Sequence, residues 1–266
     1  MLNKRILSSL ILIIITVLSI IYNWLLIIVA TTLIVLGLLE FYNMAEKKGI
    51  PVYKYFGVVI GATIPLSIFF KFELTKGWEL LFVVLLLVVL FLLQFLRRDN
   101  SGATAGISVT LFGILYISWF FSFVLKIKNL AFGSGVLASL IFITKSGDIG
   151  AYLIGSKWGV HALIPRISPK KSVEGTMGGL LFNVLAAMGS KIFLPFFSYF
   201  HLACLGFLLG IIGQFGDLSE SLIKRDCQTK DASGVFPGMG GVLDILDSLL
   251  FTAPAFYFYM SIMLNK

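Results

Sequence analysis

The chain of 266 residues is 58% hydrophobic and 13% charged, with a formal net charge of +8 and a mean hydropathy of +0.99. Because an ordinary soluble domain is about 25% charged, this composition excludes a soluble globular protein and predicts a protein of the lipid bilayer. The positive charge is not gathered into a basic domain or a stripe interleaved with aromatic residues. We therefore expect no nucleic-acid partner.

Apolar runs that can cross the hydrocarbon core recur along the whole chain. A spanning helix needs roughly 20 apolar residues, so residues 6–41 are too long for one helix, and we expect a turn at Asn23 to divide them. The pattern predicts an all-α, polytopic membrane protein with about nine transmembrane helices. The other predicted spans are 56–70, 78–96, 102–125, 131–155, 175–195, 202–216 and 248–263.

Lysine and arginine predict the orientation of these helices, because basic residues accumulate in cytoplasmic loops. With nine spans, fourteen basic residues share the side of the N-terminus and six lie on the other side. We therefore expect a cytoplasmic N-terminus, an external C-terminus, and cytoplasmic loops at 156–174 and 217–247. The fourteen are Lys4, Arg5, Lys47, Lys48, Lys54, Arg97, Arg98, Lys157, Arg166, Lys170, Lys171, Lys224, Arg225 and Lys230; the six are Lys71, Lys76, Lys126, Lys128, Lys191 and Lys266.

The acidic residues are concentrated in the second half of the chain. Carboxylates at membrane depth usually face a cavity, a partner or an ion, so Asp148, Asp217 and Asp244, next to apolar runs, are candidate site residues. The alternative is that they are solvated at the membrane interface. Eight of the thirteen acidic residues fall between 148 and 247: Asp148, Glu174, Asp217, Glu220, Asp226, Asp231, Asp244 and Asp247.

Residues 217–225 repeat polar side chains at spacings of three and four. Such a spacing puts them on one face of a helix. The face could bind a ligand, or it could be a surface stabilised by an ion pair between Glu220 and Lys224. Its members are Asp217, Glu220, Ser221, Lys224 and Arg225.

A glycine-rich turn follows this face, and Lys230 and Asp231 precede the turn. Its exposed backbone N–H groups can approach phosphate oxygens closely. Asp244 and Asp247 come next, at the start of the last helix. Carboxylates beside such a turn suit Mg²⁺, which is commonly held by one or two carboxylates together with substrate phosphates. The turn includes Gly234, Pro237, Gly238, Met239, Gly240 and Gly241.

A second polar loop carries Lys170 and Lys171 beside Ser168, just before a predicted helix. Lysines in this position favour anion binding, although a Lys-Lys pair is also typical of charge that sets topology. In the span before this loop, Lys145 and Asp148 are three residues apart. They can pair, which would lower the cost of burying either group.

Together these motifs resemble the phosphatidate cytidylyltransferase family, also called CDP-diacylglycerol synthases. The family signature is Ser-x-apolar-Lys-Arg, then Lys-Asp, then Pro-Gly-His-Gly-Gly, then Asp-Arg-x-Asp. Met239 replaces the usual His and Ile245 the usual Arg, so two phosphate donors are missing. The stretches 147–152 and 167–175 resemble two further family patterns. The matching signature residues are Ser221, Lys224, Arg225, Lys230, Asp231, Pro237, Gly238, Gly240, Gly241, Asp244 and Asp247.

The resemblance implies an enzyme of a bacterial inner membrane that converts CTP and phosphatidate into CDP-diacylglycerol and pyrophosphate. It implies one continuous membrane domain, with N-terminal helices in 1–130 and the catalytic region in 131–266. Mg²⁺ would be held by Asp217 and Asp244; a second, monovalent cation and a homodimer are left open. The implied catalytic residues are Asp148, Asp217, Asp244, Asp247, Lys224, Arg225, Lys230 and Asp231, and the implied substrate-binding residues are Ser168, Lys170, Lys171, Glu174, Glu220, Ser221, Gly238, Gly240 and Gly241.

Two other functions fit parts of the pattern. A CTP-dependent polyprenol kinase would use a hydroxyl nucleophile and so benefit from a base such as Asp148 or Asp231. A cation transporter could use Asp148, Asp217 and Asp244 as an intramembrane relay. The two basic loops and the glycine-rich turn favour phosphate chemistry over cation conduction.

Overall fold

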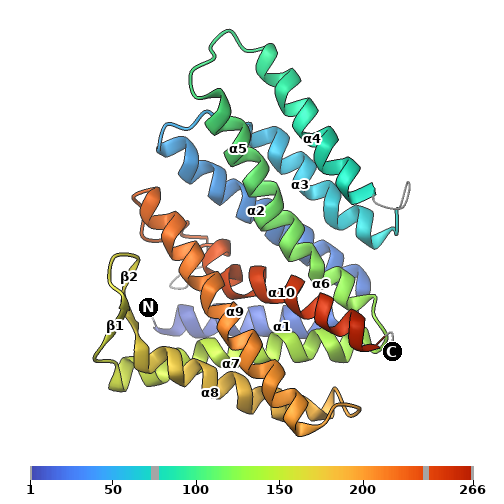
Figure 1. Cartoon of the computed structure of the whole chain (residues 1–266), viewed down its shortest axis with the longest axis vertical. Helices are drawn as coiled ribbons and strands as arrows, with labels where there is room; N and C mark the ends of the chain where they lie inside the picture. Colours follow the sequence, from blue (N-terminus) through green and yellow to red (C-terminus); the bar gives the residue numbers. More distant parts are fainter. Residues whose placement is uncertain (1, 73–77, 236–239, 265–266) are drawn as a thin grey trace.

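The computed structural model describes residues 2–72, 78–235 and 240–264, with side chains from residue 8 onward. Over these residues the chain is almost entirely helical (Figure 1). The helices are α1 (Leu2–Ile21), α2 (Asn23–Lys47), α3 (Lys54–Phe69), α4 (Trp78–Phe95), α5 (Ala103–Gly113), α6 (Phe120–Lys128), α7 (Gly133–Trp158), α8 (Val173–Gly189), α9 (Tyr199–Asp226) and α10 (Val242–Leu264).

Nine continuous helices account for these elements in the described residues, because α5, the π-helical segment Ile114–Trp119 and α6 run on without a break. The predicted division near Asn23 is confirmed, since Tyr22 is extended (φ −101°, ψ 114°) between α1 and α2. Among the described residues six helices, rather than the nine predicted spans, are long and apolar enough to cross a membrane, so the chain is a multi-pass membrane protein. The six are α2, α4, the continuous helix 103–128, α7, α9 and α10.

Helix α10 lies at the centre of the bundle. It contacts α2, α6, α7 and α9, and Figure 1 shows it between α9 and the pair formed by α2 and α6. Leu250 and Phe256 of α10 share one buried apolar core with Leu38 of α2 and Leu140 of α7. The first helices of the chain therefore pack directly against the helix that follows the glycine-rich turn.

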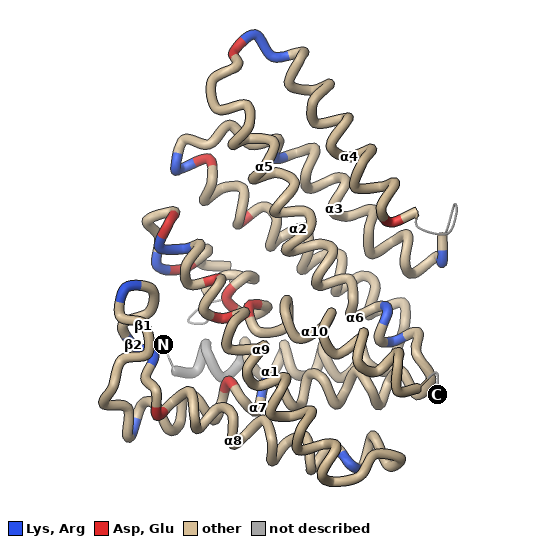
Figure 2. The backbone as a smooth tube through the Cα atoms, viewed as in Figure 1, with Lys and Arg blue, Asp and Glu red and all other residues tan. Residues whose placement is uncertain are grey.

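Charged residues gather at the ends of the bundle, and most of the Lys and Arg residues lie at the end that holds the N-terminus (Figure 2). At this end α2 and α9 finish and α10 begins. An ion pair between Lys48 Nζ and Asp226 Oδ2 (2.6 Å) joins the residue that follows α2 to the last residue of α9. The C-terminus lies at the opposite end (Figure 1).

A small β-hairpin at this polar end departs from the all-α prediction. Strands β1 (Ala162–Ile164) and β2 (Ser168–Ser172) pair antiparallel, with Ala162 opposite Ser172. The second strand contains a proline and two lysines and has no apolar alternation, so the sequence carries no strand signal there. The Ser172 side chain then accepts a hydrogen bond from the N–H of Gly175 (3.1 Å) and caps α8.

Two helix ends at the polar end lie outside the predicted spans. Helix α9 continues to Asp226, beyond the predicted span 202–216, because its polar residues share helical faces as their spacing indicated. Helix α10 begins at Val242 rather than at residue 248. The first turn of α10 is stabilised by carboxylates that accept hydrogen bonds from its backbone N–H groups. A span predicted from apolar residues alone does not include such a polar turn.

Candidate functional site

A cavity of about 550 Å³ lies at the polar end, bordered by α7, α8, α9, the hairpin and the start of α10. Its wall brings together charged residues that the sequence separates by up to a hundred positions. Four of the predicted acidic residues and two predicted lysines line it: Asp148, Asp217, Asp244, Asp247, Lys170 and Lys171. Tertiary packing therefore brings these six residues to one cavity, while their roles stay a prediction.

The hairpin brings Lys171 onto α9. Lys171 Nζ lies 2.5 Å from Asp217 Oδ1, so strand β2 and helix α9 are joined by an ion pair on the cavity wall. Neither side chain is fully buried, with 27% and 35% of its surface exposed. The Lys171 Nζ atom itself is buried beside Asp217, so an anion would bind this lysine by displacing the Asp217 carboxylate.

The predicted pair between Lys145 and Asp148 is confirmed, with 2.8 Å between Nζ and Oδ2. Lys145 also donates to the Ile245 carbonyl (2.9 Å), and the Ser248 hydroxyl donates to Asp148 (3.0 Å). These bonds fasten α7 to α10. They satisfy the lysine inside the bundle and fix the Asp148 carboxylate at the cavity wall.

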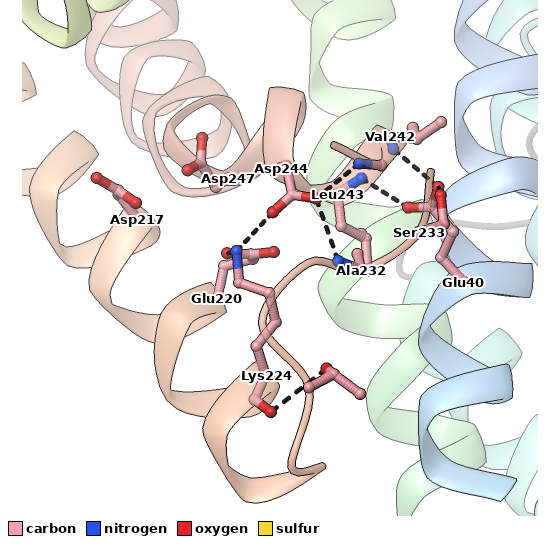
Figure 3. Close-up of polar contacts among 12 residues, drawn as sticks. Glu40, Asp217, Glu220, Lys224, Ala232, Ser233, Val242, Leu243, Asp244 and Asp247 are labelled. Atoms are coloured by element: carbon pink, nitrogen blue, oxygen red, sulfur yellow. Dashed lines mark hydrogen bonds and ion pairs between the residues drawn. The ribbon is translucent and has the colours of Figure 1, made fainter. Parts of the chain in front are cut away.

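Lys224 connects α9 with α10 (Figure 3). Its Nζ lies 2.5 Å from Glu220 Oε2 and 2.5 Å from Asp244 Oδ1. Only 13% of the Lys224 side chain and 2% of the Glu220 side chain are exposed. The ion pair between Glu220 and Lys224 is thus present, but it lies inside the protein rather than on a helix surface. Lys224 also pairs with Asp244 on another helix.

Asp244 is also the cap of its own helix. Its Oδ2 accepts hydrogen bonds from the N–H groups of Gly241 (2.6 Å) and Ala232 (3.2 Å). A carboxylate in the first turn is stabilised by the positive end of the helix dipole. Gly240 has φ +98°, a conformation that favours glycine, and a Cβ there would lie 2.5 Å from Asp244 Oδ2.

Glu40 of α2 is a residue of this region that sequence analysis missed. Its buried carboxylate accepts the N–H groups of Val242 (2.9 Å) and Leu243 (3.0 Å) and the hydroxyl of Ser233 (Figure 3). A Cβ on Gly241 would lie 2.6 Å from Glu40 Oε2. The sequence did carry one sign of this residue, because Glu40 is a single carboxylate within an apolar span, and such a residue usually has a specific partner.

Two predicted residues brace the hairpin instead of lining the cavity. Arg225 Nε donates to the Ile167 carbonyl (3.1 Å), which holds the turn of the hairpin against α9. Glu174 accepts the N–H groups of Val160 (3.1 Å) and His161 (3.2 Å), and the His161 ring lies 2.6 Å from it. Both contacts fix the lysine-bearing strand.

Ten of the predicted residues lie outside the cavity wall in the described part of the chain. They are Ser168, Glu174, Glu220, Ser221, Lys224, Arg225, Lys230, Asp231, Gly240 and Gly241. Gly238 falls outside the described residues, as do Pro237 and Met239. Conversely, the wall contains uncharged polar residues that the sequence analysis did not select, among them Thr144, Asn183 and Gln214.

Assignment of Mg²⁺ to Asp217 and Asp244 stays a prediction. Among the described residues, no group of three or more His, Cys, Asp or Glu side chains is placed to hold a metal ion. Mg²⁺ does not require such a group, because one or two carboxylates and substrate phosphates commonly suffice. Asp148, Asp217, Asp244 and Asp247 offer hard oxygen donors to one cavity, so the donor chemistry fits this ion.

Comparison with known proteins gives a consistent result. The sequence pattern of the Cytidylyltransferase family matches residues 3–263. A phosphatidate cytidylyltransferase of Bacillus subtilis is 30% identical over 228 residues, which cover 85% of each chain, and one of Synechocystis is 30% identical, covering 87% of this chain and 86% of its own. The Escherichia coli protein YnbB, described as uncharacterized, is 34% identical over 63% of this chain, which spans 58% of that relative.

Proposed function

The chain belongs to the cytidylyltransferase family and is a nucleotidyltransferase, and we propose that it transfers CMP from CTP to phosphatidate, giving CDP-diacylglycerol and pyrophosphate. The cavity that unites Lys170 and Lys171 with carboxylates at one end of membrane-spanning helices carries this proposal. Its charged residues suit a triphosphate. Its apolar wall, which includes Leu163 and Leu209, suits a lipid.

The lipid phosphate supplies its own nucleophile. Its second pKa is about 6, so it is largely dianionic at pH 7 and needs no general base. One of its oxygens attacks the α-phosphorus of CTP, the bond from that phosphorus to the bridging oxygen breaks, and pyrophosphate leaves with the electron pair. Both histidines are engaged elsewhere, His161 with Glu174 and His201 with Tyr259.

The main task of the protein is to bring two polyanions together. Lys170 and Lys171 hold phosphate oxygens at the cavity wall. When Lys171 turns to a phosphate, its partner Asp217 is released. Asp217 and Asp244, with Asp148 and Asp247 in support, would hold Mg²⁺, which when bound offsets the charge of the triphosphate.

Lys224 and Arg225 act as positioning residues in this proposal. Lys224 neutralises the buried Glu220 and orients Asp244, since it lies 2.5 Å from both carboxylates. Arg225 holds the hairpin that carries the two lysines. Direct phosphate contacts from Ser168, Ser221 and Lys230 stay a prediction.

The cavity opens toward the cytoplasm in the orientation that we propose. Lys and Arg are more abundant at its end of the bundle (Figure 2), and the two termini lie at opposite ends, as nine crossings require. The relatives named above come from bacteria, which supports the inner membrane as its location. This orientation exposes the site to cytoplasmic CTP.

An assay of the purified protein tests the proposed function. Labelled CTP, phosphatidate and Mg²⁺ in detergent should yield a CDP-lipid and pyrophosphate in equal amounts. Release of CDP together with a phosphorylated alcohol would instead identify a lipid kinase.

A further inference from the structure

Asn183 is a buried amide whose place in the cavity has no structural explanation. It lies on α8, is 5% exposed, and lines the cavity with Thr144 of α7 and Gly210 of α9. Its Oδ1 has no hydrogen-bond partner among the described residues. Buried polar groups are normally paired, so an unpaired amide on a cavity wall points to a partner supplied by a ligand.

The neighbouring helices leave room for this amide. A Cβ on Gly147 of α7 would lie 2.6 Å from Asn183 Cγ, and a Cβ on Gly210 of α9 would lie 2.7 Å from Nδ2. Any larger residue at either position would displace the side chain. Two glycines from different helices therefore form a niche in which the amide, rather than an apolar side chain, reaches the cavity.

The niche lies next to Asp148, which directly follows Gly147 on α7, but away from Asp217 and the two hairpin lysines. Gly210 precedes Asp217 by seven residues, about 10 Å along α9. Leu209 lines the wall at this level, whereas Lys170 and Lys171 line it near the hairpin. A lipid phosphate at the lysines would direct its glycerol, a few bonds away, toward Asn183.

We propose that the Asn183 amide binds the ester-linked glycerol of the lipid substrate, with its NH₂ group donating to an ester carbonyl oxygen. An amide presents either its NH₂ or its oxygen to a ligand after a half-turn about the Cβ–Cγ bond. An ester carbonyl is the acceptor that a diacyl lipid carries at this depth, between its phosphate and its acyl chains. The inference rests on the proposed function for the identity of the lipid.

The test compares phosphatidate with its dialkyl ether analogue, which keeps the phosphate and chain length but lacks both carbonyls. Binding of each labelled lipid to the purified protein, and KM and kcat for each, would be measured in mixed micelles. Wild-type protein should prefer the diester roughly five- to tenfold, the factor that one neutral hydrogen bond provides. In Asn183→Leu this preference should disappear, because the diester should bind more weakly while the diether binds as before. The KM for CTP should not change.

Gln214→Leu is the matched control, because Gln214 also lines the cavity but its amide is already paired with the Thr176 carbonyl (2.8 Å). This variant should keep the ester preference. Equal binding of the two lipids by wild-type protein, or an unchanged preference in Asn183→Leu, would overturn the inference; the wild-type comparison needs no variant to fold. If the wild-type protein binds the diester preferentially but forms no CDP-lipid, the proposed function would be contradicted, whereas the inferred contact of Asn183 with the ester would still hold.

Discussion

Lys224 on α9 and Asp244 on α10 form a largely buried ion pair 2.5 Å long, with 13% and 12% of the two side chains exposed, and the same lysine neutralises the buried Glu220. If one of these three side chains loses its charge, the charges of the other two are no longer balanced, and the low dielectric around them makes this costly. The pair therefore links the stability of the helix ends with the geometry of the cavity wall. The predictions below separate these two effects.

Asp244→Asn should lower CDP-lipid formation by roughly 100-fold or more, because the amide keeps the size of the side chain but cannot neutralise Lys224 or hold Mg²⁺. The measurement is turnover across a Mg²⁺ titration at matched membrane expression. Asp226→Asn is the control, since Asp226 pairs with Lys48 in an exposed position and such a pair is worth about 1 kcal/mol or less. Near wild-type activity in Asp244→Asn would contradict the proposed role of Asp244 as a Mg²⁺ ligand.

Lys171→Gln should raise KM for CTP and lower the Mg²⁺ concentration needed for half-maximal activity. The first effect follows from the loss of a phosphate contact, and the second from the loss of the lysine that competes for Asp217. Asp217→Asn should instead lose activity at every Mg²⁺ concentration. A Lys171→Gln variant that needs more Mg²⁺ would contradict the proposed exchange of partners.

Glu40→Gln should destabilise the protein by about 1–3 kcal/mol and reduce activity, because one amide oxygen cannot replace a carboxylate that accepts two N–H groups and a hydroxyl. Thermal unfolding in detergent and CDP-lipid formation are the measurements. Glu46→Gln on the same helix removes an exposed pair with Lys54 and should change stability by no more than about 0.5 kcal/mol. Equal effects of the two substitutions would show that Glu40 has no special role.

Gly241→Ala should impair both folding and activity, since its Cβ would lie 2.6 Å from the Glu40 carboxylate. Gly234→Ala provides the control within the same loop, because no atom of the described residues lies within 4 Å of its Cβ position. Expression level, thermal unfolding and turnover should therefore fall for the first variant only. Comparable losses in both would mean that the whole loop, rather than its contact with α2, requires glycine.

Arg166→Cys, in a background without Cys204 and Cys227, should resist an impermeant thiol reagent applied to intact cells, because the hairpin turn is expected in the cytoplasm. Phe132→Cys, at the exposed turn between α6 and α7, should react. Permeabilised cells supply the positive control for Arg166→Cys. The reverse labelling pattern would invert the proposed topology.

The nine helices and the main charged residues of the cavity were predictable from local patterns. Apolar runs mark the helices, six of which, in the described part of the chain, have the length and hydropathy of a membrane span. Carboxylates or lysines beside such runs are costly enough to indicate a site, as for Asp148 and Asp217. The hairpin was not predictable, because two short strands with a proline and paired lysines have no periodic signal.

By itself, the sequence determined that the chain is a helical membrane protein with its acidic residues concentrated in the second half. Only the tertiary structure decided which charges pair between different elements: Lys171 with Asp217, and Lys224 with Asp244. It also decided that Glu40, about two hundred residues away, caps α10, and that two glycines make room for Asn183. The physical reason is that periodicity reports which face of a helix is apolar, whereas ion pairs and cavities depend on how several helices pack together.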